Sequence, residues 1–387
     1  MSVAKSNHNY DQYMLRGKLR KNGFEHWRYI FCGVNKITNL EKVFFVEMFM
    51  VNPDVSPATP VVSHKTRTKI DAGDLQYALT GNKTNIDDKV NQKVQPSYVL
   101  IKAGAFGERG KQINKVIQCS ELKFIKNGNC IKAGDCIFGE DTLTGTLLVT
   151  EKDLLLRAEI PADAGSMDWN LHYERNIGIS QINNKNDSVW IPYGCRTIFL
   201  GSVHLDGIEY EVVPANPSGY CDKTWGTNFN DPFVHISCSN IVSRITGQTL
   251  EKTCFTIEND CNNNLRGSII IEGREFPVKP GLFKSSQIHD CAQMPKEADG
   301  DKLHWSVSLH IRQYIVDIDV YCKTQEMFLK NWESPDGSNN MLKVLCGGSG
   351  KGDIKIFKKI HRNLETIEMG KLENVICEYG TRDDQVE

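Results

Sequence analysis

Apolar residues recur along the chain in short runs, and turn-forming residues separate these runs. The runs are rich in Val, Ile, Phe and Tyr, while Gly, Asn, Asp and Pro gather between them. This pattern is typical of the strands of a β-sandwich or barrel, and no long segment shows a helical period. The predicted strands cover 28–34, 42–51, 97–103, 143–150, 153–159, 197–204, 208–213, 233–242, 251–258, 267–272, 306–321, 341–346, 353–360 and 366–378. We therefore predict an all-β fold, with at most one short helix over Lys111–Phe124.

The segment 306–321 changes phase within one predicted strand. Apolar residues occupy odd positions in 307–311 and even positions in 316–320. A shift by one residue moves the buried side chains to the other face of a strand. We predict one long strand with a bulge or sharp bend between Arg312 and Ile315, as is common in barrels.

Two segments lack periodicity and divide the chain. The segment 53–96 is rich in Pro, Thr, Lys, Asn and Asp and is expected to be a long excursion, either a lid or a surface insertion. A length of 387 residues favours two domains, and the Pro-rich break within 214–232 is the best boundary. We predict an N-terminal β domain over 1–214 and a C-terminal β domain over 215–387.

Composition and charge exclude several classes of partner. Lys and Arg total 46 and Asp and Glu total 48, so the chain lacks the basic surplus that nucleic-acid binding requires. The longest apolar run, Val43–Val51, is interrupted by Glu47 and is far shorter than the roughly 20 residues of a membrane span. The segment Met1–Tyr13 is polar and lacks a signal core. We expect a cytoplasmic protein without a nucleic-acid partner or a transmembrane segment.

The 13 cysteines form neither a disulfide pattern nor a metal motif. Their number is odd, no Cys-x-x-Cys occurs, and the closest pair, Cys130 and Cys136, has no His pair nearby. We interpret most of them as reduced core residues, which fits a reducing compartment. No metal site is predicted.

The motifs of common enzyme classes are also missing. Gly347–Gly352 resembles a phosphate loop, but Leu345 stands at the first glycine position and Gly352 at the hydroxyl position, so we interpret it as a hairpin turn. Gly104–Gly110 lacks the spacing of a dinucleotide fingerprint. His-Glu-x-x-His and Gly-x-Ser-x-Gly do not occur. These absences count against nucleotide-dependent enzymes, zinc hydrolases and α/β-hydrolases, and no cofactor is predicted.

Two clusters of polar and aromatic residues remain. In Gly23–Phe31, strand alternation places the odd-numbered residues of 25–29 on one face and the even-numbered residues of 26–30 on the other. The second cluster, Tyr220–Asn240, joins an acid, a lysine, a Trp-Gly pair and amides to an apolar strand. Such a segment at a barrel mouth often carries function. The alternative is a tryptophan that closes the barrel end beside a solvated Asp–Lys pair.

Both clusters resemble motifs of the tocopherol cyclase family. Glu25–Trp27 resembles that family's Phe-Glu-Gly-Trp-Tyr-Phe opening, and Tyr220–Gly226 resembles its Tyr-x-Glu-Lys-Asn-Trp-Gly motif. More distantly, both are similar to carotenoid hydratases and AttH-like proteins. The resemblance implies two packed lipocalin-like antiparallel β-barrels or sandwiches that bind a lipophilic small molecule. The activities that it implies need no cofactor and comprise ring closure driven by protonation, hydration of double bonds and pericyclic cyclisation. Some members are not known to catalyse a reaction.

Departures from the family motifs indicate a different ligand. His26 stands where the family has Gly and Arg28 where it has an aromatic residue, while Phe233 and His235 replace tryptophans. Tryptophan faces stabilise cations, so their loss disfavours a long isoprenoid cation. A smaller, more polar and phenolic ligand fits these residues better.

These features lead to a set of predicted site residues. A buried acid with a raised pKa could protonate a double bond, and a histidine could move a proton to or from a phenol. Glu47, on an apolar strand face, is a further candidate acid. The predicted catalytic residues are Asp222, His235 and Glu25, and the predicted substrate-binding residues are Trp27, Tyr220, Lys223, Trp225, Asn228 and Phe233. For each, a structural role is the alternative: a core histidine, a solvated ion pair or a barrel plug.

The leading hypothesis is a cofactor-independent cyclase, isomerase or hydratase that uses general acid–base catalysis in a pocket between the domains. A non-catalytic binding protein for a lipophilic or aromatic small molecule is the alternative. A third option is an interaction protein whose barrels are filled by side chains. The oligomeric state is left open, with a homo-oligomer among the options.

Overall fold

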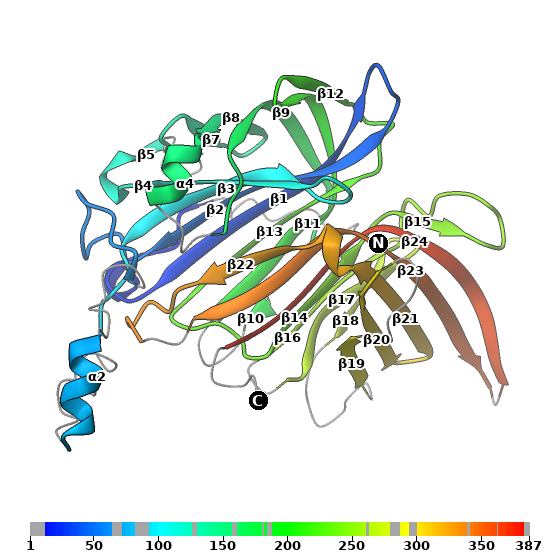
Figure 1. Ribbon diagram of the computed structural model, residues 1–387. Coiled ribbons are helices and arrows are strands. Elements are labelled where there is room, and N and C mark those ends of the chain that lie inside the picture. The colour runs from blue at the N-terminus through cyan, green and yellow to red at the C-terminus, as the bar shows by residue number, and fades with distance from the viewer. Residues whose placement is uncertain are drawn as a thin grey trace.

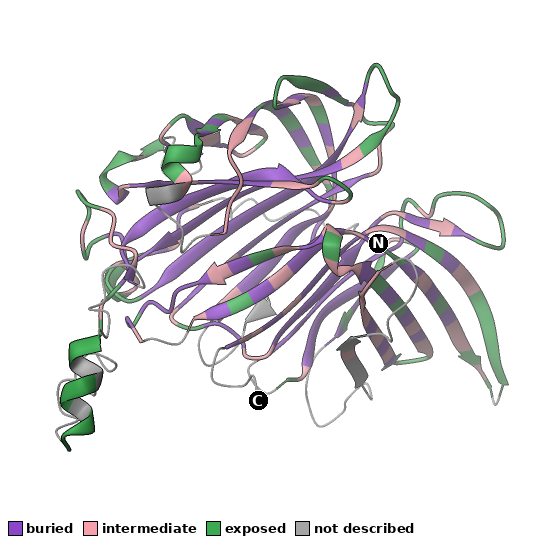
Figure 2. Ribbon diagram, in the orientation of Figure 1, coloured by how far each residue is buried: buried purple, intermediate pink, exposed green. Residues whose placement is uncertain are grey.

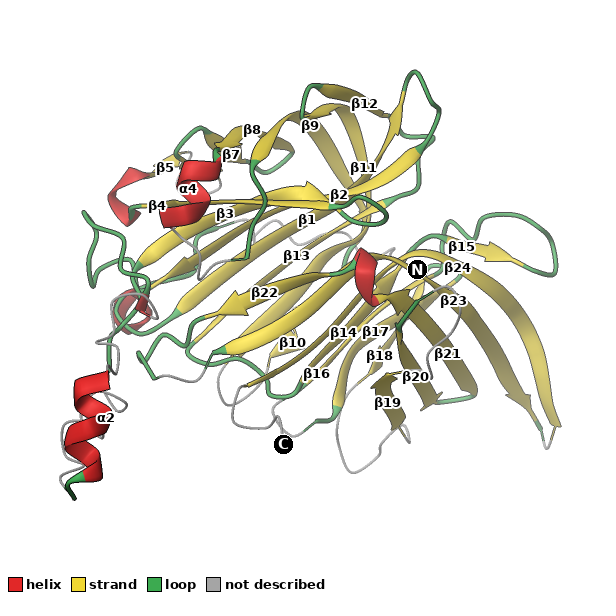
Figure 3. Cartoon of the chain, viewed as in Figure 1, coloured by secondary structure: helices red, strands yellow, loops and turns green. Residues whose placement is uncertain are grey.

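The computed structural model describes most of the chain. The described residues are 12–63, 72–81, 93–125, 130–156, 161–179, 182–183, 188–260, 263–278, 287–293, 300–338, 341–361 and 363–382. Among them, two antiparallel sheets account for nearly all regular structure (Figure 3). The predicted all-β fold of two packed antiparallel sheets is confirmed.

The first sheet has 13 strands in the described residues and runs in the order β4-β3-β2-β1-β12-β11-β9-β8-β7-β6-β5. Strand β10 pairs with β11, and β13 pairs with both β1 and β11. The strands are β1 (Phe24–Asn35), β2 (Glu41–Val51), β3 (Tyr98–Ala105), β4 (Lys111–Ile117), β5 (Leu122–Ile125), β6 (Cys130–Ala133), β7 (Cys136–Phe138), β8 (Thr142–Val149), β9 (Gly165–Ile177), β10 (Ile182–Asn183), β11 (Ser188–Leu205), β12 (Ile208–Val212) and β13 (Gly219–Gly226).

The second sheet has 11 described strands in the order β18-β17-β16-β14-β24-β23-β21-β20-β19, and β15 and β22 pair with β24 and β23. The strands are β14 (Phe233–Cys238), β15 (Ile241–Ser243), β16 (Cys254–Asn259), β17 (Leu265–Ile271), β18 (Arg274–Val278), β19 (Gln287–Gln293), β20 (Lys302–Ile311), β21 (Tyr314–Lys323), β22 (Phe328–Trp332), β23 (Leu342–Ile360) and β24 (Asn363–Arg382). Helical segments are few and short: α2 (Ala72–Leu79), α4 (Glu151–Leu156), and the 3-10 turns Gly17–Arg20, Cys119–Glu121 and Thr324–Glu326.

Each sheet curls around its own core, and the two sheets pack against each other (Figure 1). Strand β1 contacts both the core of the first sheet and the second sheet. Trp27 and Tyr29 belong to the core of the first sheet, whereas Phe24 and Ile30 belong to clusters that join the two sheets. The strand is therefore buried on both faces over residues 24–33, as the buried colour along most of β1 in Figure 2 shows. We call the space between the sheets the interface.

The segment 306–321 is a hairpin, so the prediction of one bent strand was wrong. Strands β20 and β21 pair directly, with Ile311 opposite Tyr314, and Arg312 takes a positive φ of 56° in the turn. Directly opposed residues point to the same face, so odd positions before the turn match even positions after it. The turn thus produces the phase change that a bulge would also produce.

Three further local predictions were wrong. Lys111–Phe124 forms β4, a 3-10 turn and most of β5 instead of a helix, and the segment predicted as a strand at 153–159 begins in helix α4. Gly347–Gly352 lies inside β23, where the register with β24 shifts, and is not a hairpin turn. Glycines there allow close strand packing, because a Cβ on Gly352 would lie 1.9 Å from the carbonyl oxygen of Asp319.

The two-domain division at residue 214 stays a prediction, but the sheets do change near it. Strand β13, which carries the Trp-Gly motif, pairs within the first sheet, and the second sheet begins with β14 at Phe233. The excursion expected at 53–96 separates β2 from β3 and includes α2. All twelve cysteines in the described residues are free, and ten are buried. No helix in the described part of the chain is long and apolar enough to cross a membrane.

Candidate functional site

A row of charged residues crosses the interface side of the first sheet. Asp222 on β13 is the register partner of Arg28 on β1, Arg28 is the partner of Glu47 on β2, and Glu47 is the partner of Lys102 on β3. All four are buried. Because directly opposed residues share a face, strand pairing alone places alternating charges in line.

A second row crosses the facing side of the second sheet. Arg266 on β17 is opposite Glu258 on β16, and Glu258 is opposite His235 on β14. His235 is opposite Glu378 on β24, which is opposite Cys346 on β23. All five are buried, so ionic groups line both sides of the interface. Buried charges of this kind must be paired to be tolerated.

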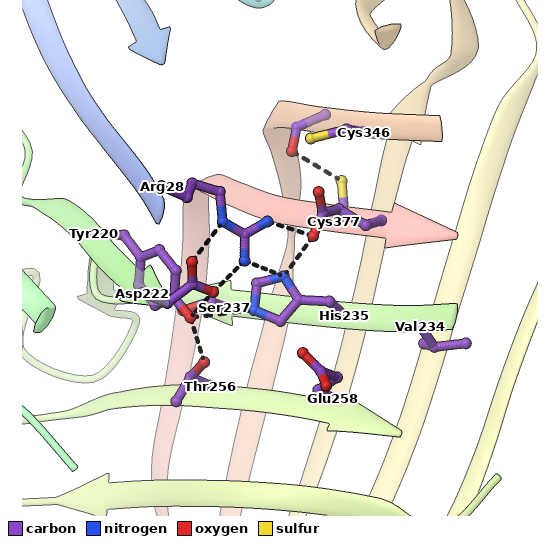
Figure 4. A network of polar contacts seen from close by, with 12 residues as sticks. Arg28, Tyr220, Asp222, Val234, His235, Ser237, Thr256, Glu258, Cys346 and Cys377 are labelled. Atoms are coloured by element: carbon purple, nitrogen blue, oxygen red, sulfur yellow. Dashed lines mark hydrogen bonds and ion pairs between the residues drawn. The ribbon is translucent and has the colours of Figure 1, made fainter. Parts of the chain in front are cut away.

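Arg28 joins the two rows (Figure 4). Its Nε donates to Asp222 Oδ1 at 3.0 Å, its Nη2 donates to Asp222 Oδ2, and its Nη1 donates to Glu378 Oε2. Burial would raise the pKa of Glu378, but Arg28, His235 and Lys330 outweigh it and hold that pKa well below its ordinary value. One guanidinium therefore bonds a carboxylate on each sheet.

Asp222 is held as a fully engaged acceptor. Besides the two bonds from Arg28, its Oδ2 accepts from Trp190 Nε1 at 3.1 Å and from the Tyr220 hydroxyl at 3.0 Å. Burial raises the pKa of Tyr220 well above its ordinary value, so its hydroxyl keeps its proton and remains a donor. The Tyr220 hydroxyl is also 3.1 Å from Thr256 Oγ1. Four donors on one carboxylate suit a fixed anion better than a proton donor.

His235 lies between these anions. Its Nδ1 is 3.0 Å from Glu378 Oε2 and 3.3 Å from Arg28 Nη2, and its Nε2 is 3.4 Å from the Tyr220 hydroxyl. A ring that donates through Nδ1 to Glu378 is oriented by that carboxylate, as in catalytic His–carboxylate pairs. The other oxygen of Glu378, Oε1, accepts no hydrogen bond from the described residues.

A second ionic group lies at the other end of the first row. Lys330 on β22 donates to Glu47 Oε1, and His26 Nε2 is 3.4 Å from Glu47 Oε2. Burial opposes ionisation of Glu47, but Lys330 and His26 lower its pKa well below the ordinary value. Burial lowers the pKa of Lys102 to about 8, against the attraction of Glu47. The group therefore contains one buried amine that loses its proton more readily than an ordinary lysine.

A small cavity opens at the interface beside both groups. Its volume is about 20 Å³, room for about one water molecule. It is lined by Phe24, His26, Arg28, Ser188, Thr224, Phe229, Asn230, Phe233, Glu258 and Trp332. Burial raises the pKa of Glu258, more than Arg266 and His235 lower it. Glu258 Oε1 accepts from Arg266 Nη2, and from Asn230 Nδ2 at 3.1 Å. The cavity thus combines aromatic rings with a buried carboxyl group whose pKa is raised.

The predicted catalytic residues do not all lie in one site. Asp222 and His235 lie at the interface, but Glu25 points into the core of the first sheet. There its Oε1 accepts from Trp27 Nε1 at 2.7 Å and pairs with Lys223 Nζ at 2.8 Å. Strand alternation separates them, because odd residues of β1 face the core and even residues face the interface.

The predicted substrate-binding residues are divided in the same way. Trp27, Lys223 and Trp225 form a group in the first core, where Lys223 Nζ lies 4.2 Å and 5.5 Å from the two ring centres. The alternative of a solvated Asp–Lys pair does not hold, because the side chains of Asp222 and Lys223 are both buried and lie on opposite faces of β13.

The remaining predicted residues lie at the interface. Tyr220 contacts Asp222 and Thr256, and Phe233 packs on Trp332 with ring centres 5.5 Å apart. Asn228 Oδ1 accepts from the backbone N–H of Phe229 at 2.9 Å.

Several residues of the site were missed from the sequence. Glu258, Glu378, Arg266, Trp190 and Lys330 come from five different strands. A signal for Glu258 existed, because it follows Phe255 and Ile257 in a mostly apolar run, the same signal that marked Glu47. No equivalent signal connects Glu378 to Arg28, which lies 350 residues earlier.

The described residues contain no group of three or more His, Cys, Asp or Glu side chains that could hold a metal ion. No protein-family model and no curated protein sequence matches the chain.

Among solved structures, an AttH-like protein from Nitrosomonas europaea matches with 9% identity and a TM-score of 0.44, over 92% of this chain and 91% of that one. Kievitone hydratase from Nectria haematococca matches with 10% identity and a TM-score of 0.42, over 97% and 96%. The neighbours thus include a hydratase and an AttH-like protein, and neither is described as a tocopherol cyclase.

Proposed function

We propose that this protein is a cofactor-independent enzyme that moves protons on a lipophilic or phenolic small molecule at the interface, as a hydratase, cyclase or isomerase. Glu258 carries the proposal. It is a buried carboxyl group with a raised pKa, and it lines a cavity together with the aromatic rings of Phe24, Phe229, Phe233 and Trp332. A protonated acid in an apolar pocket is what the protonation of a double bond requires.

The proposed step balances without a co-reactant. Glu258 gives its proton to one carbon of the double bond, and the positive charge that develops on the neighbouring carbon lies among the aromatic rings. Water adds to that carbon in hydration, and a phenol oxygen of the same molecule adds in cyclisation. The proton released from the adding oxygen returns to the Glu258 carboxylate, so the enzyme is regenerated.

His235 has the role of a proton relay in this proposal. It is the register neighbour of Glu258, and Glu378 orients its ring through Nδ1. Asp222, predicted as an acid, becomes a positioning residue for Arg28. Glu25, also predicted as catalytic, becomes a positioning residue for Trp27 and Lys223 in the first core.

Substrate binding requires the cavity to widen, because it has room for about one water molecule. The connection between β13 and β14 contributes Phe229 and Asn230 to the lining. We propose that this connection moves outward to admit the substrate, as loops over active sites commonly do.

The alternative is a non-catalytic binding protein that uses the same cavity. The dense pairing of Arg28, Asp222 and Glu378 favours it, because an interface held by such bonds also serves a purely structural purpose. The two functions differ in whether a bound compound changes chemically.

The test combines ligand retention with turnover. Compounds extracted from the purified protein are identified by mass spectrometry. Those compounds, and a panel of phenols that carry one alkenyl side chain, are then incubated with the protein in ²H₂O. An enzyme incorporates deuterium or adds the elements of ²H₂O, and Glu258→Gln lowers this rate at least 100-fold while binding is kept.

Glu209→Gln is the matched control, because Glu209 is exposed and pairs with Lys36 on the outer surface. Its rate should equal that of the wild type. A wild-type protein that binds a compound and leaves it unchanged supports the binding protein. An unchanged rate in Glu258→Gln overturns the assignment of the proton donor.

A further inference from the structure

A second and larger pocket lies on the first sheet, away from the interface. Its volume is about 280 Å³, close to the lower end for small-molecule sites, and it is open to solvent. It is lined by Ile101, Lys115, Ile117, Glu121, Lys123, Lys132, Ala133, Gly134, Asp135, Cys136, Thr146 and Leu147. It shares no lining residue with the interface cavity.

Two lysines of this pocket lie opposite each other, and neither charge is paired with an acid in the described residues. Lys123 on β5 is the direct register partner of Lys132 on β6, so their side chains share one face of the hairpin. Like charges in directly opposed positions destabilise a strand pair. Within the described residues, neither lysine forms an ion pair, whereas Lys115 lies 4.0 Å from Asp135.

The apolar part of the lining comes from the core of the first sheet. Five buried members of that core belong to the lining, and they come from five strands: Ile101 on β3, Ile117 on β4, Ala133 on β6, Cys136 on β7 and Leu147 on β8. A ligand in this pocket therefore meets hydrocarbon on one side and ammonium groups on the other. An uncharged lipid would leave the two opposed lysines unpaired.

The acids of the pocket limit the charge that it accepts. Glu121 and Asp135 belong to the lining, so the three lysines exceed the acids by a single charge. A polyanion such as a nucleotide would face these carboxylates, whereas one carboxylate group between Lys123 and Lys132 would not. The composition of the pocket fits a monoanion best.

We propose that this pocket binds a small amphipathic anion, with its carboxylate between Lys123 and Lys132 and its hydrocarbon part against Ile101, Ile117 and Leu147. This site is separate from the proposed catalytic cavity and does not depend on it. The anion relieves the repulsion between the opposed lysines, and its hydrocarbon part leaves water on entering the pocket.

The experiment uses decanoate as the probe and decanol as its uncharged analogue, each titrated into the full chain by calorimetry. The test variant is the double substitution Lys123→Glu with Lys132→Glu. The matched control is Lys351→Glu with Lys355→Glu, because both control lysines are exposed on β23 of the second sheet. Circular dichroism confirms that both variants keep their β structure.

Decanoate should bind the wild type and the control variant equally, and at least tenfold more weakly to the test variant. Decanol should bind the wild type more weakly than decanoate and should not distinguish the variants. Higher salt should weaken decanoate binding, because the attraction is between charges near solvent. Equal decanoate affinity in the test variant, equal affinity for decanol and decanoate, or no decanoate binding at millimolar concentration would each overturn the proposal.

Discussion

Replacement of Arg28 by methionine tests whether the interface depends on one cation. Arg28 is the only residue in the described chain that bonds both Asp222 and Glu378. Its side chain is 3% exposed, and those of the two carboxylates are 3% and 0% exposed. Methionine keeps much of the volume and removes the charge. Arg28→Met therefore leaves two buried carboxylates without their shared counter-charge.

The expected decrease in the free energy of unfolding is large compared with the decrease on losing a surface ion pair. Removing one partner of a buried pair typically costs about 3–5 kcal/mol, because an uncompensated buried charge remains. Arg20 supplies the matched control. It forms two hydrogen bonds to Asp54 at 2.7 and 2.6 Å, but the two side chains are 38% and 35% exposed. Arg20→Met should cost no more than about 1 kcal/mol.

The assay is urea unfolding, followed by tryptophan fluorescence because Trp190 bonds Asp222. The pH dependence adds a second readout. The pKa of Glu378 is lowered in the folded protein, so its contribution to stability is full above its unfolded pKa and is lost as the pH falls below it. In Arg28→Met the pKa of Glu378 rises, so this carboxylate takes up a proton at a higher pH. The difference in free energy of unfolding between the wild type and the variant should therefore narrow as the pH falls from about 6 toward 4. A loss below about 1 kcal/mol at pH 7, equal to that of Arg20→Met, would refute the reasoning.

Substitutions of Lys102 and of two glycines also have defined outcomes. Lys102→Met should stabilise the protein by about 3 kcal/mol below pH 8, because the pKa of Lys102 is about 8 when folded against about 10.4 when unfolded. Wild-type stability should rise with pH between about 8 and 10, and urea unfolding across that range should show no such rise in the variant. Gly352→Ala should cost about 3 kcal/mol, since its methyl group would overlap the Asp319 carbonyl. Gly107→Ala meets no atom within 4 Å and should cost about 1 kcal/mol, through its positive φ alone. Equal thermal shifts for both glycine variants would contradict this expectation.

The strands and their faces could be read from the sequence because they depend on local alternation. The pattern at 25–30 separated residues that enter the core of the first sheet from those that enter the interface, and the structure has the same division. Where two local structures produce the same pattern, the prediction failed. The phase change at 306–321 follows from a hairpin as well as from a bulge, because both reverse which positions face the core.

The alternation of residues along β1 and β13 determined by itself that Arg28 and Asp222 face away from Trp27 and Lys223, since side chains two apart share a face. Only the tertiary structure decided which side chains contact each face of these strands. Glu378 reaches Arg28 from the far end of the chain, because packing of the second sheet on the first brings β24 opposite β1. Glu258 acquires its raised pKa from burial at that interface, which no local pattern specifies. Alternation selects a side of a strand, whereas the partner on that side depends on how distant strands pair and pack.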